Sequence, residues 1–150
     1  VWQTMEKAKV HTFQILTKQP ERMAEFLKRR NKPALKNVWL GASVEDECVT
    51  YRIAELKRCR AAVRFISFEP LIGPVGKINL SDIHWAIVGG ESGPNSRPLD
   101  INWVDQIFDQ CELYDVHFFF KQWGGVNKKR TGRTFKGRTW DDMPNLHVHA

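Results

Sequence analysis

The sequence predicts an α/β fold, specifically a partial (β/α) barrel of the TIM type with about five parallel strands. Apolar, β-rich runs alternate with longer segments of helical periodicity. The strands also divide by parity into an apolar set and a set that ends in polar groups. Reactive polar residues come where the strands end, the edge at which α/β folds collect ligand-binding groups.

Strands are predicted over residues 11–17, 37–44, 61–68, 83–89 and 116–121. Helices are predicted over residues 20–30, 46–60 and 101–114. Pro20 suits a first helical turn, acidic residues 45–47 favour a helix N-terminus, and Asp100 is expected to cap residues 101–114. The segment 69–76 is rich in Pro and Gly, which predicts a loop rather than a regular helix.

The second predicted strand shows the division by parity most clearly. Its apolar set, suited to covering helices, is Val38, Leu40, Ala42 and Val44. Its polar-ended set, suited to a barrel interior, is Trp39, Gly41, Ser43 and Glu45. The first strand divides in the same way.

Charged side chains recur where the predicted strands end. They are Lys18, Glu45, Glu69, Glu91 and Lys121. Three carboxylates and two amines around one cavity suit proton transfer or the binding of a polar substrate, so we expect these residues to be catalytic. The alternative is that they cap helices or form salt bridges across the top of the barrel.

Further residues at the same edge are expected to bind substrate or cofactor. They are Ser43, Asp46, Gly89, Gly90, Ser92, Arg97, Gln122 and Trp123. A strand that runs into glycines can expose backbone N–H groups to an anion, although residues 89–94 lack a phosphate-loop pattern and a tight turn is the alternative. Trp123 follows a strand end and is a candidate stacking wall for an aromatic ligand.

Composition places the 150 residues, with 42% hydrophobic and 27% charged, in the range of one globular domain. We expect residues 1–126 to form the barrel part and residues 127–150 a basic tail with a small hairpin at Lys136 and Gly137. The net charge of +6 favours an anionic partner such as a nucleotide or a nucleic acid. Apolar stretches too short for a bilayer predict no membrane partner and a cytoplasmic protein.

The three cysteines, Cys48, Cys59 and Cys111, have spacings that match neither a metal cluster nor a disulfide framework, so no metal site is expected within this chain. The first residue is Val1, and residues 1–9 read as helix running into strand without a signal-peptide pattern. The chain is therefore expected to begin within a longer protein.

Six ordered motifs carry a resemblance to a known family. They are HTFQILTKQPERM (11–23), NVWLGASVED (37–46), RFISFEPLIGPV (64–75), WAIVGGESGPNSRP (85–98), FFFKQWG (118–124) and GRTWDDMP (137–144). Together they resemble the phage gene-product thirty-seven/sixty-eight family of phage and prophage proteins. The family's shared strand-end positions fall on Lys18, Glu45, Asp46, Glu69, Glu91, Ser92, Arg97, Lys121, Gln122 and Trp123.

Full-length members of this family resemble radical S-adenosylmethionine proteins. The resemblance implies that S-adenosylmethionine and a [4Fe–4S] cluster bind the full-length protein and that this chain, which lacks the clustered cysteines, is a C-terminal part that is inactive alone. Gly89-Gly90-Glu91 is similar to a Gly-Gly-Glu that contacts the cofactor in that superfamily. There the motif follows soon after the cluster loop, whereas here at least three predicted strands precede it.

Two alternative functions stay open at this point. One is a non-enzymatic nucleic-acid-binding module that uses the basic tail, with cations from Lys128 to Arg138 interleaved with Phe135 and Trp140. The other is a barrel protein that has lost radical chemistry and binds a small anionic metabolite.

Overall fold

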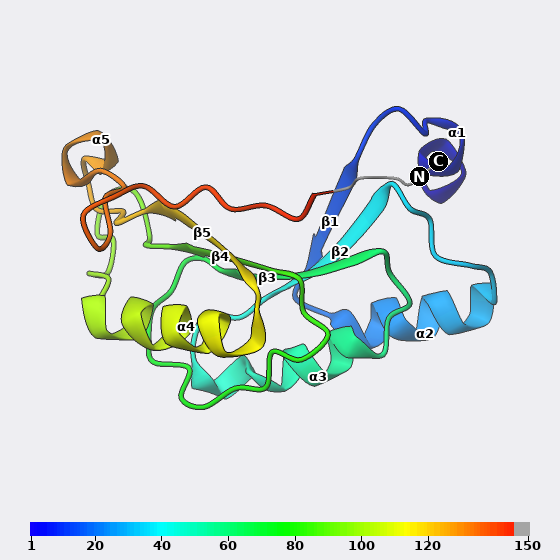
Figure 1. The fold of residues 1–150 in the computed structure, drawn as a ribbon, viewed down its shortest axis with the longest axis horizontal. Helices are drawn as coiled ribbons and strands as arrows, with labels where there is room; N and C mark the ends of the chain where they lie inside the picture. The colour runs from blue at the N-terminus through cyan, green and yellow to red at the C-terminus, as the bar shows by residue number, and fades with distance from the viewer. Residues whose placement is uncertain (146–150) are drawn as a thin grey trace.

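The computed structural model describes residues 1–145, with the side chain of Lys128 excepted. Its strands are β1 (Phe13–Thr17), β2 (Val38–Ser43), β3 (Val63–Phe68), β4 (Trp85–Gly89) and β5 (His117–Gln122). Its α-helices are α1 (Trp2–Lys7), α2 (Pro20–Arg30), α3 (Tyr51–Lys57), α4 (Ile101–Tyr114) and α5 (Lys128–Thr131), and η1 (Glu47–Val49) is a 3₁₀ turn. Figure 1 shows these elements along the chain.

The strands form one five-stranded sheet in the order β1-β2-β3-β4-β5, and all neighbouring pairs are parallel. The predicted positions of all five strands and their parallel pairing are confirmed. A sheet of this kind is compatible with part of a barrel or with an open, Rossmann-like arrangement.

Helices α2, α3 and α4 lie on one face of this sheet (Figure 1). The main core lies between them and the strands, and it includes Leu40, Ile66 and Val88 from the sheet with Leu56 and Ile107 from the helices. The predicted apolar parity set of β2 belongs to this core, because Val38, Leu40, Ala42 and Val44 are all buried in it. Residues that alternate with these form the opposite side of the sheet, which we call the second face.

Aromatic side chains cover the second face. Trp39, Val63, Phe65 and Trp85 form a separate buried cluster there, with Ile87 and Phe119 packed against it. The Trp39 and Trp85 ring centroids are 5.7 Å apart in an edge-on arrangement, and those of Trp85 and Phe119 are 6.0 Å apart. The geometry is one that aromatic pairs prefer.

The predicted ends of α2 and α4 are confirmed, but the helix predicted over 46–60 is wrong at both ends. Asp46 Oδ1 accepts a hydrogen bond from the Cys48 backbone N–H, which closes η1 and delays the α-helix until Tyr51. At the other end, the Cys59 N–H bonds back to Leu56 O, so the helix tightens after Lys57. Asp100 caps α4 as expected, accepting from the Asn102 N–H at 2.8 Å.

Residues 69–84 connect β3 to β4 without a helix, as predicted, and begin with a cis Glu69–Pro70 peptide bond. Their backbone is fixed by hydrogen bonds from Leu71 N to Gly89 O and from Ile72 N to Glu45 O. Leu71 is almost fully buried in the main core. The connection therefore packs as part of the domain and holds the ends of β2 and β4.

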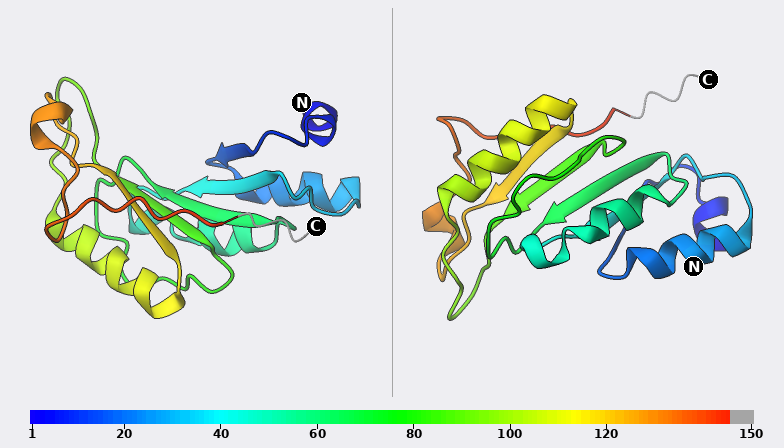
Figure 2. Two further views of the ribbon diagram at one scale, coloured as in Figure 1. Left: turned by 45° about the horizontal axis from the view of Figure 1, so that its top comes forward. Right: turned by 90° about the horizontal axis from the view of Figure 1, so that it is seen from below.

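The segment after α5 returns along the outer side of β5 (Figure 2). The chain turns at Lys136 and Gly137, and Phe135 and Arg138 bridge across the turn. The Phe120 N–H donates to Trp140 O at 2.9 Å, and Phe119 pairs with Asp141 in an antiparallel bridge. Residues 146–150 of the predicted tail lie outside the described residues.

Candidate functional site

The carboxyl-terminal ends of the strands meet at one edge of the sheet because the strands are parallel. This edge carries the five residues expected to be catalytic, Lys18, Glu45, Glu69, Glu91 and Lys121. Each of the three carboxylates is paired with a cation. The strand-end edge of the sheet therefore holds three separate ion-paired groups, one around each carboxylate.

Glu45 follows β2 and is held by two cations. Lys18 Nζ lies 2.6 Å from its Oε1 and Arg52 Nη1 lies 2.9 Å from its Oε2. Burial raises the pKa of the Glu45 carboxyl, but the hydrogen bond from Lys18 and the charges of Lys18 and Arg52 outweigh it and hold the pKa below its ordinary value. Glu45 is thus a fixed anion. Arg52 was not singled out from the sequence, which offers no signal that it turns back from α3 to a strand end.

Glu69 and Lys121 pair across β4, with Lys121 Nζ 3.1 Å from Glu69 Oε1. Glu69 follows β3 and Lys121 lies in β5, so Gly89 at the end of β4 sits between their strands. A Cβ at Gly89 would lie 3.2 Å from Glu69 Cδ. The missing side chain at Gly89 therefore leaves the space through which Glu69 reaches Lys121.

Glu91 forms an ion pair with Arg97. Arg97 Nε and Nη2 each lie 2.8 Å from one of its oxygens, and the Arg97 backbone N–H donates to Oε2 at 2.9 Å. These hydrogen bonds lower the pKa of the Glu91 carboxyl to about 2. The pair closes the loop of residues 91–97, and both carboxylate oxygens are used within the chain.

The glycines after β4 permit two backbones to approach closely. A Cβ at Gly90 would lie 2.1 Å from Trp123 O, and a Cβ at Gly124 would lie 2.2 Å from Glu91 O. The Gly125 N–H donates to Glu91 O at 2.7 Å. The tight packing of these segments accounts for Gly90 and Gly124, as the turn alternative expects.

The other residues expected to bind a ligand also have partners in the chain. Gln122 Nε2 donates to Ser92 Oγ at 2.8 Å. Ser43 is buried, and its backbone oxygen accepts from Arg52 Nη1 at 3.0 Å. Trp123 packs on Phe120, with ring centroids 4.8 Å apart, and its Nε1 donates to Thr134 O. Its ring is used in internal packing.

A hollow of about 410 Å³ lies on the second face and reaches the Glu69–Lys121 pair. It is lined by Gln14, Leu16, Phe65, Ser67, Glu69, Trp85, Ile87, Phe119, Lys121 and Met143. Only the ion pair among these was singled out from the sequence. The alternation used for β2 could have found the strand residues if it had been extended along β3, β4 and β5.

Trp85 contributes an unusual donor to this region. Its side chain is 4% exposed, and its Nε1 has no hydrogen-bond partner among the described residues. A buried indole N–H normally finds an acceptor. The hollow itself combines an aromatic floor and an ion pair, which suits a small ligand with apolar and polar parts.

Three of the tail cations in the alternative nucleic-acid hypothesis have contacts within the chain. Lys136 Nζ lies 2.7 Å from Asp105 Oδ1, and Arg133 pairs with Asp141. The Arg138 guanidinium stacks 3.5 Å from the Trp140 ring centroid. Phe135 is only 2% exposed. These contacts bind the tail to α4 and β5.

The thiols do not fit a [4Fe–4S] cluster, which requires several thiolates that converge on iron. Burial raises the pKa of the Cys59 thiol to about 11 and that of the Cys111 thiol to about 12, while Cys48 is exposed. Within residues 1–145, no three His, Cys, Asp or Glu side chains are grouped as metal ligands. We therefore derive no step through a cluster from this chain.

Comparisons with known proteins identify one family. No curated protein and no solved structure matches the chain. Within the described part, no helix has the length and apolar character required to cross a membrane. The model of a family described as "Protein of unknown function (DUF5131)" matches residues 1–144. Because this match extends over nearly all of the 150 residues, the chain belongs to the DUF5131 family.

Proposed function

We propose that the chain forms the ligand-facing wall of a (β/α) barrel and binds a small zwitterionic ligand in the hollow of the second face. The strand order supports the barrel. Strands follow one another in chain order and their helices lie on one face, as in barrels, whereas doubly wound sheets reverse direction and carry helices on both faces. The second face then corresponds to the barrel interior.

The outer edge of β1 supports the same proposal. In the described chain β1 pairs only with β2, so its other side is available to a further parallel strand. A groove beside it contains Leu16 and Phe26, which are 49% and 45% exposed. Apolar groups beside an unpaired strand edge suit the packing of another strand–helix unit.

The observation that carries the ligand proposal is the Glu69–Lys121 ion pair at the hollow. The Glu69 side chain is 20% exposed and that of Lys121 is 53% exposed, so a ligand can reach both charges. A ligand carboxylate would pair with Lys121 and a ligand ammonium group with Glu69. The aromatic rings of Phe65, Trp85 and Phe119 would contact its apolar body.

Chemistry at this site would use the same two side chains. The Glu69 carboxylate can accept a proton and the Lys121 ammonium can donate one, and their pairing keeps both near a bound head group. The radical S-adenosylmethionine chemistry implied by the phage-family resemblance is part of this proposal only for a longer protein. The thiolates that such chemistry requires would come from outside the described residues.

Nuclear magnetic resonance titration tests the proposal. L-phenylalanine, L-methionine and adenosine are added to the ¹⁵N-labelled chain while the indole signal of Trp85 is followed. We expect a saturable shift with the amino acids and a weakening of about tenfold or more in a Glu69→Gln/Lys121→Met variant, since each lost charge-assisted contact contributes about 1.5–3 kcal/mol.

The matched control is Glu112→Gln/Lys77→Met, which makes the same charge changes at exposed positions outside the hollow. It should leave the titration unchanged. The proposal fails if neither amino acid gives a saturable shift, even where adenosine does, or if the Glu69→Gln/Lys121→Met variant binds the amino acids as well as the parent chain.

A further inference from the structure

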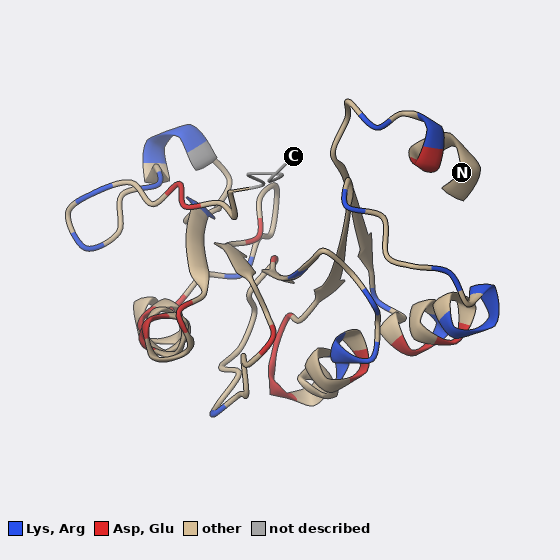
Figure 3. Cartoon of the chain, turned by 45° about the vertical axis from the view of Figure 1, so that its right-hand side comes forward, with Lys and Arg blue, Asp and Glu red and all other residues tan. Residues whose placement is uncertain are grey.

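A second cavity lies far from the strand ends described above, between the last turn of α2, the segment 31–34 and the end of α3. Its volume is about 300 Å³. Four cations line it, Lys28, Lys32, Arg58 and Arg60, and no carboxylate does. Figure 3 shows Lys and Arg gathered at this end of α2. We call these four residues the basic cavity cluster.

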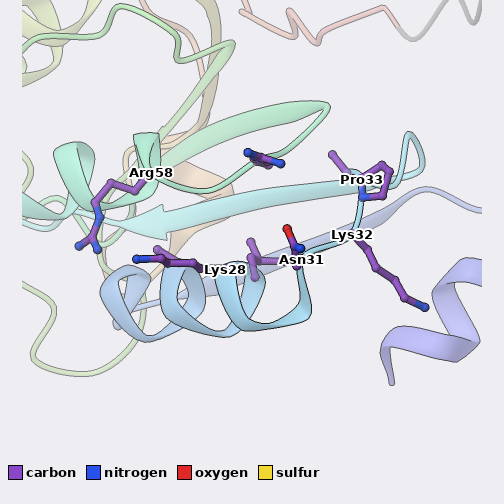
Figure 4. A pocket seen from close by; sticks show the side chains of 9 residues that line it. Lys28, Asn31, Lys32, Pro33 and Arg58 are labelled. Carbon is purple, nitrogen blue, oxygen red and sulfur yellow. The ribbon is translucent and has the colours of Figure 1, made fainter.

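The charges of the basic cavity cluster are mostly unneutralised. Within residues 1–145, Arg58 pairs with Glu55, while Lys28, Lys32 and Arg60 have no ion-pair or hydrogen-bond partner. Figure 4 shows Lys28 and Arg58 extending in the same direction along the cavity, whereas Lys32 points away toward α1. Lys28 and Arg60 are therefore the unneutralised cations of the cavity, with Arg58 paired to Glu55 and Lys32 at the rim.

Direct hydrogen bonds to the helix-end carbonyls do not account for these cations. The Leu27 carbonyl in the last turn of α2 is bonded by the Asn31 backbone N–H at 3.1 Å. Near the end of α3, the Leu56 carbonyl accepts from the Cys59 N–H, and the Cys59 carbonyl accepts from Arg64 Nη1. Backbone groups and Arg64 thus satisfy these carbonyls, and Lys28 and Arg60 remain available to a ligand.

From this arrangement we infer a binding site for a small molecule that carries two or more linked phosphate groups. Guanidinium and ammonium groups are the side chains that bind phosphate oxygens best. Lys28 and Arg60, with the Arg58 guanidinium lining the same cavity, oppose the negative charges of a diphosphate or triphosphate. Asn31 adds an amide, and Ala24, Leu27 and Pro33 give the cavity an apolar wall for the rest of the ligand.

The cavity size favours a small molecule over a nucleic acid. A volume of about 300 Å³ is at the lower end for ligand pockets, and a concave site encloses a compact phosphate chain more completely than a duplex backbone. This inference is independent of the ligand proposed for the second face, because the two cavities share no lining residue.

Isothermal titration calorimetry with inorganic tripolyphosphate tests the site, using the whole 150-residue chain at low ionic strength. We expect saturable binding at one site, and a loss of about tenfold or more in affinity in Lys28→Gln/Arg60→Gln. The matched control, Lys7→Gln/Lys77→Gln, removes the same charge from exposed positions outside the cavity and should change the affinity less than about twofold.

Three outcomes would overturn the inference. Tripolyphosphate would give no saturable heat, or both double variants would weaken binding equally, which would indicate general attraction to the net positive charge. A single-stranded oligonucleotide that binds through Lys28 and Arg60 while tripolyphosphate does not would instead assign the cluster to nucleic acid. Circular dichroism of each variant verifies that a lost affinity does not come from unfolding.

Discussion

The two edges of the sheet differ in how their outward backbone groups are satisfied. At β5 the returning segment supplies a carbonyl to the Phe120 N–H and buries Phe135 against the strand. At β1 nothing in the described chain pairs with the outer side, and Leu16 and Phe26 stay about half exposed. One edge is therefore finished by the chain itself, and the other is suited to receive a further element.

The largest expected effect is at the finished edge. Phe135→Ala should lower the free energy of unfolding by about 3–5 kcal/mol, because Phe135 is 2% exposed and packs on Phe118, Phe120 and Trp123. Phe26→Ala beside β1 should cost about 1 kcal/mol or less, since Phe26 is 45% exposed. Urea unfolding followed by fluorescence measures both.

If Phe135→Ala and Phe26→Ala lowered the free energy of unfolding by the same amount, the contrast between the two sheet edges would be contradicted. An equal loss would mean either that the returning segment contributes little to the core or that Phe26 is covered in solution. Thr139→Ala, an exposed position in the same segment, should change stability by less than about 0.5 kcal/mol and shows whether truncation there matters by itself.

Hydrogen exchange distinguishes the edges without mutation. The Phe13 N–H donates to Asn37 O next to β2, so alternation places the N–H groups of Gln14 and Leu16 on the outer side of β1. We expect these amides to exchange on the order of a hundredfold faster than the Phe120 amide. Equal protection at low protein concentration would show that β1 is covered after all.

The backbones that follow β4 and β5 pack closely against each other. We therefore expect substitutions there to lower the free energy of unfolding by an intermediate amount. Gly90→Ala places a methyl group 2.1 Å from Trp123 O, and neither backbone can yield easily, so we expect a loss of about 1–3 kcal/mol. Gly76→Ala meets no atom within 4 Å and is the control for the added methyl group alone. Its cost, about 1 kcal/mol, comes from its positive φ of 63°.

Alternation and strand-end chemistry were enough to predict the sheet, because periodicity is local. They placed Glu69 and Lys121 at one edge, but their pairing depends on Gly89 in a third strand, which no local pattern reveals. Arg52 was missed as well, since its partner Glu45 follows β2 and no pattern in α3 marks Arg52 as turning back to it. The delayed start of α3 also escaped prediction, because acidic residues favour a helix N-terminus without specifying a 3₁₀ turn first.

The smallest expected effect concerns two histidines, His84 before β4 and His11 before β1. His84 precedes β4, and its Nδ1 accepts a hydrogen bond from the Arg64 N–H at 3.0 Å. Burial, and then the charge of Arg64, hold the pKa of His84 below its ordinary 6.5. As the pH falls through about 6.5, the unfolded chain takes up the proton first, so stability is complete above that pH and declines below it until the folded pKa is reached.

His84→Asn keeps an acceptor oxygen near the position of Nδ1 but cannot take up a proton. Between about pH 7.5 and about pH 5.5 it should lose less stability than the parent chain, by about 1 kcal/mol or less, as measured from urea midpoints. His11→Asn, exposed beside β1, should leave the parent profile unchanged. Glu45 does not interfere in this pH range, because its pKa lies below the ordinary 4.5. A parent-like decline in His84→Asn would therefore show that this histidine does not couple folding to pH.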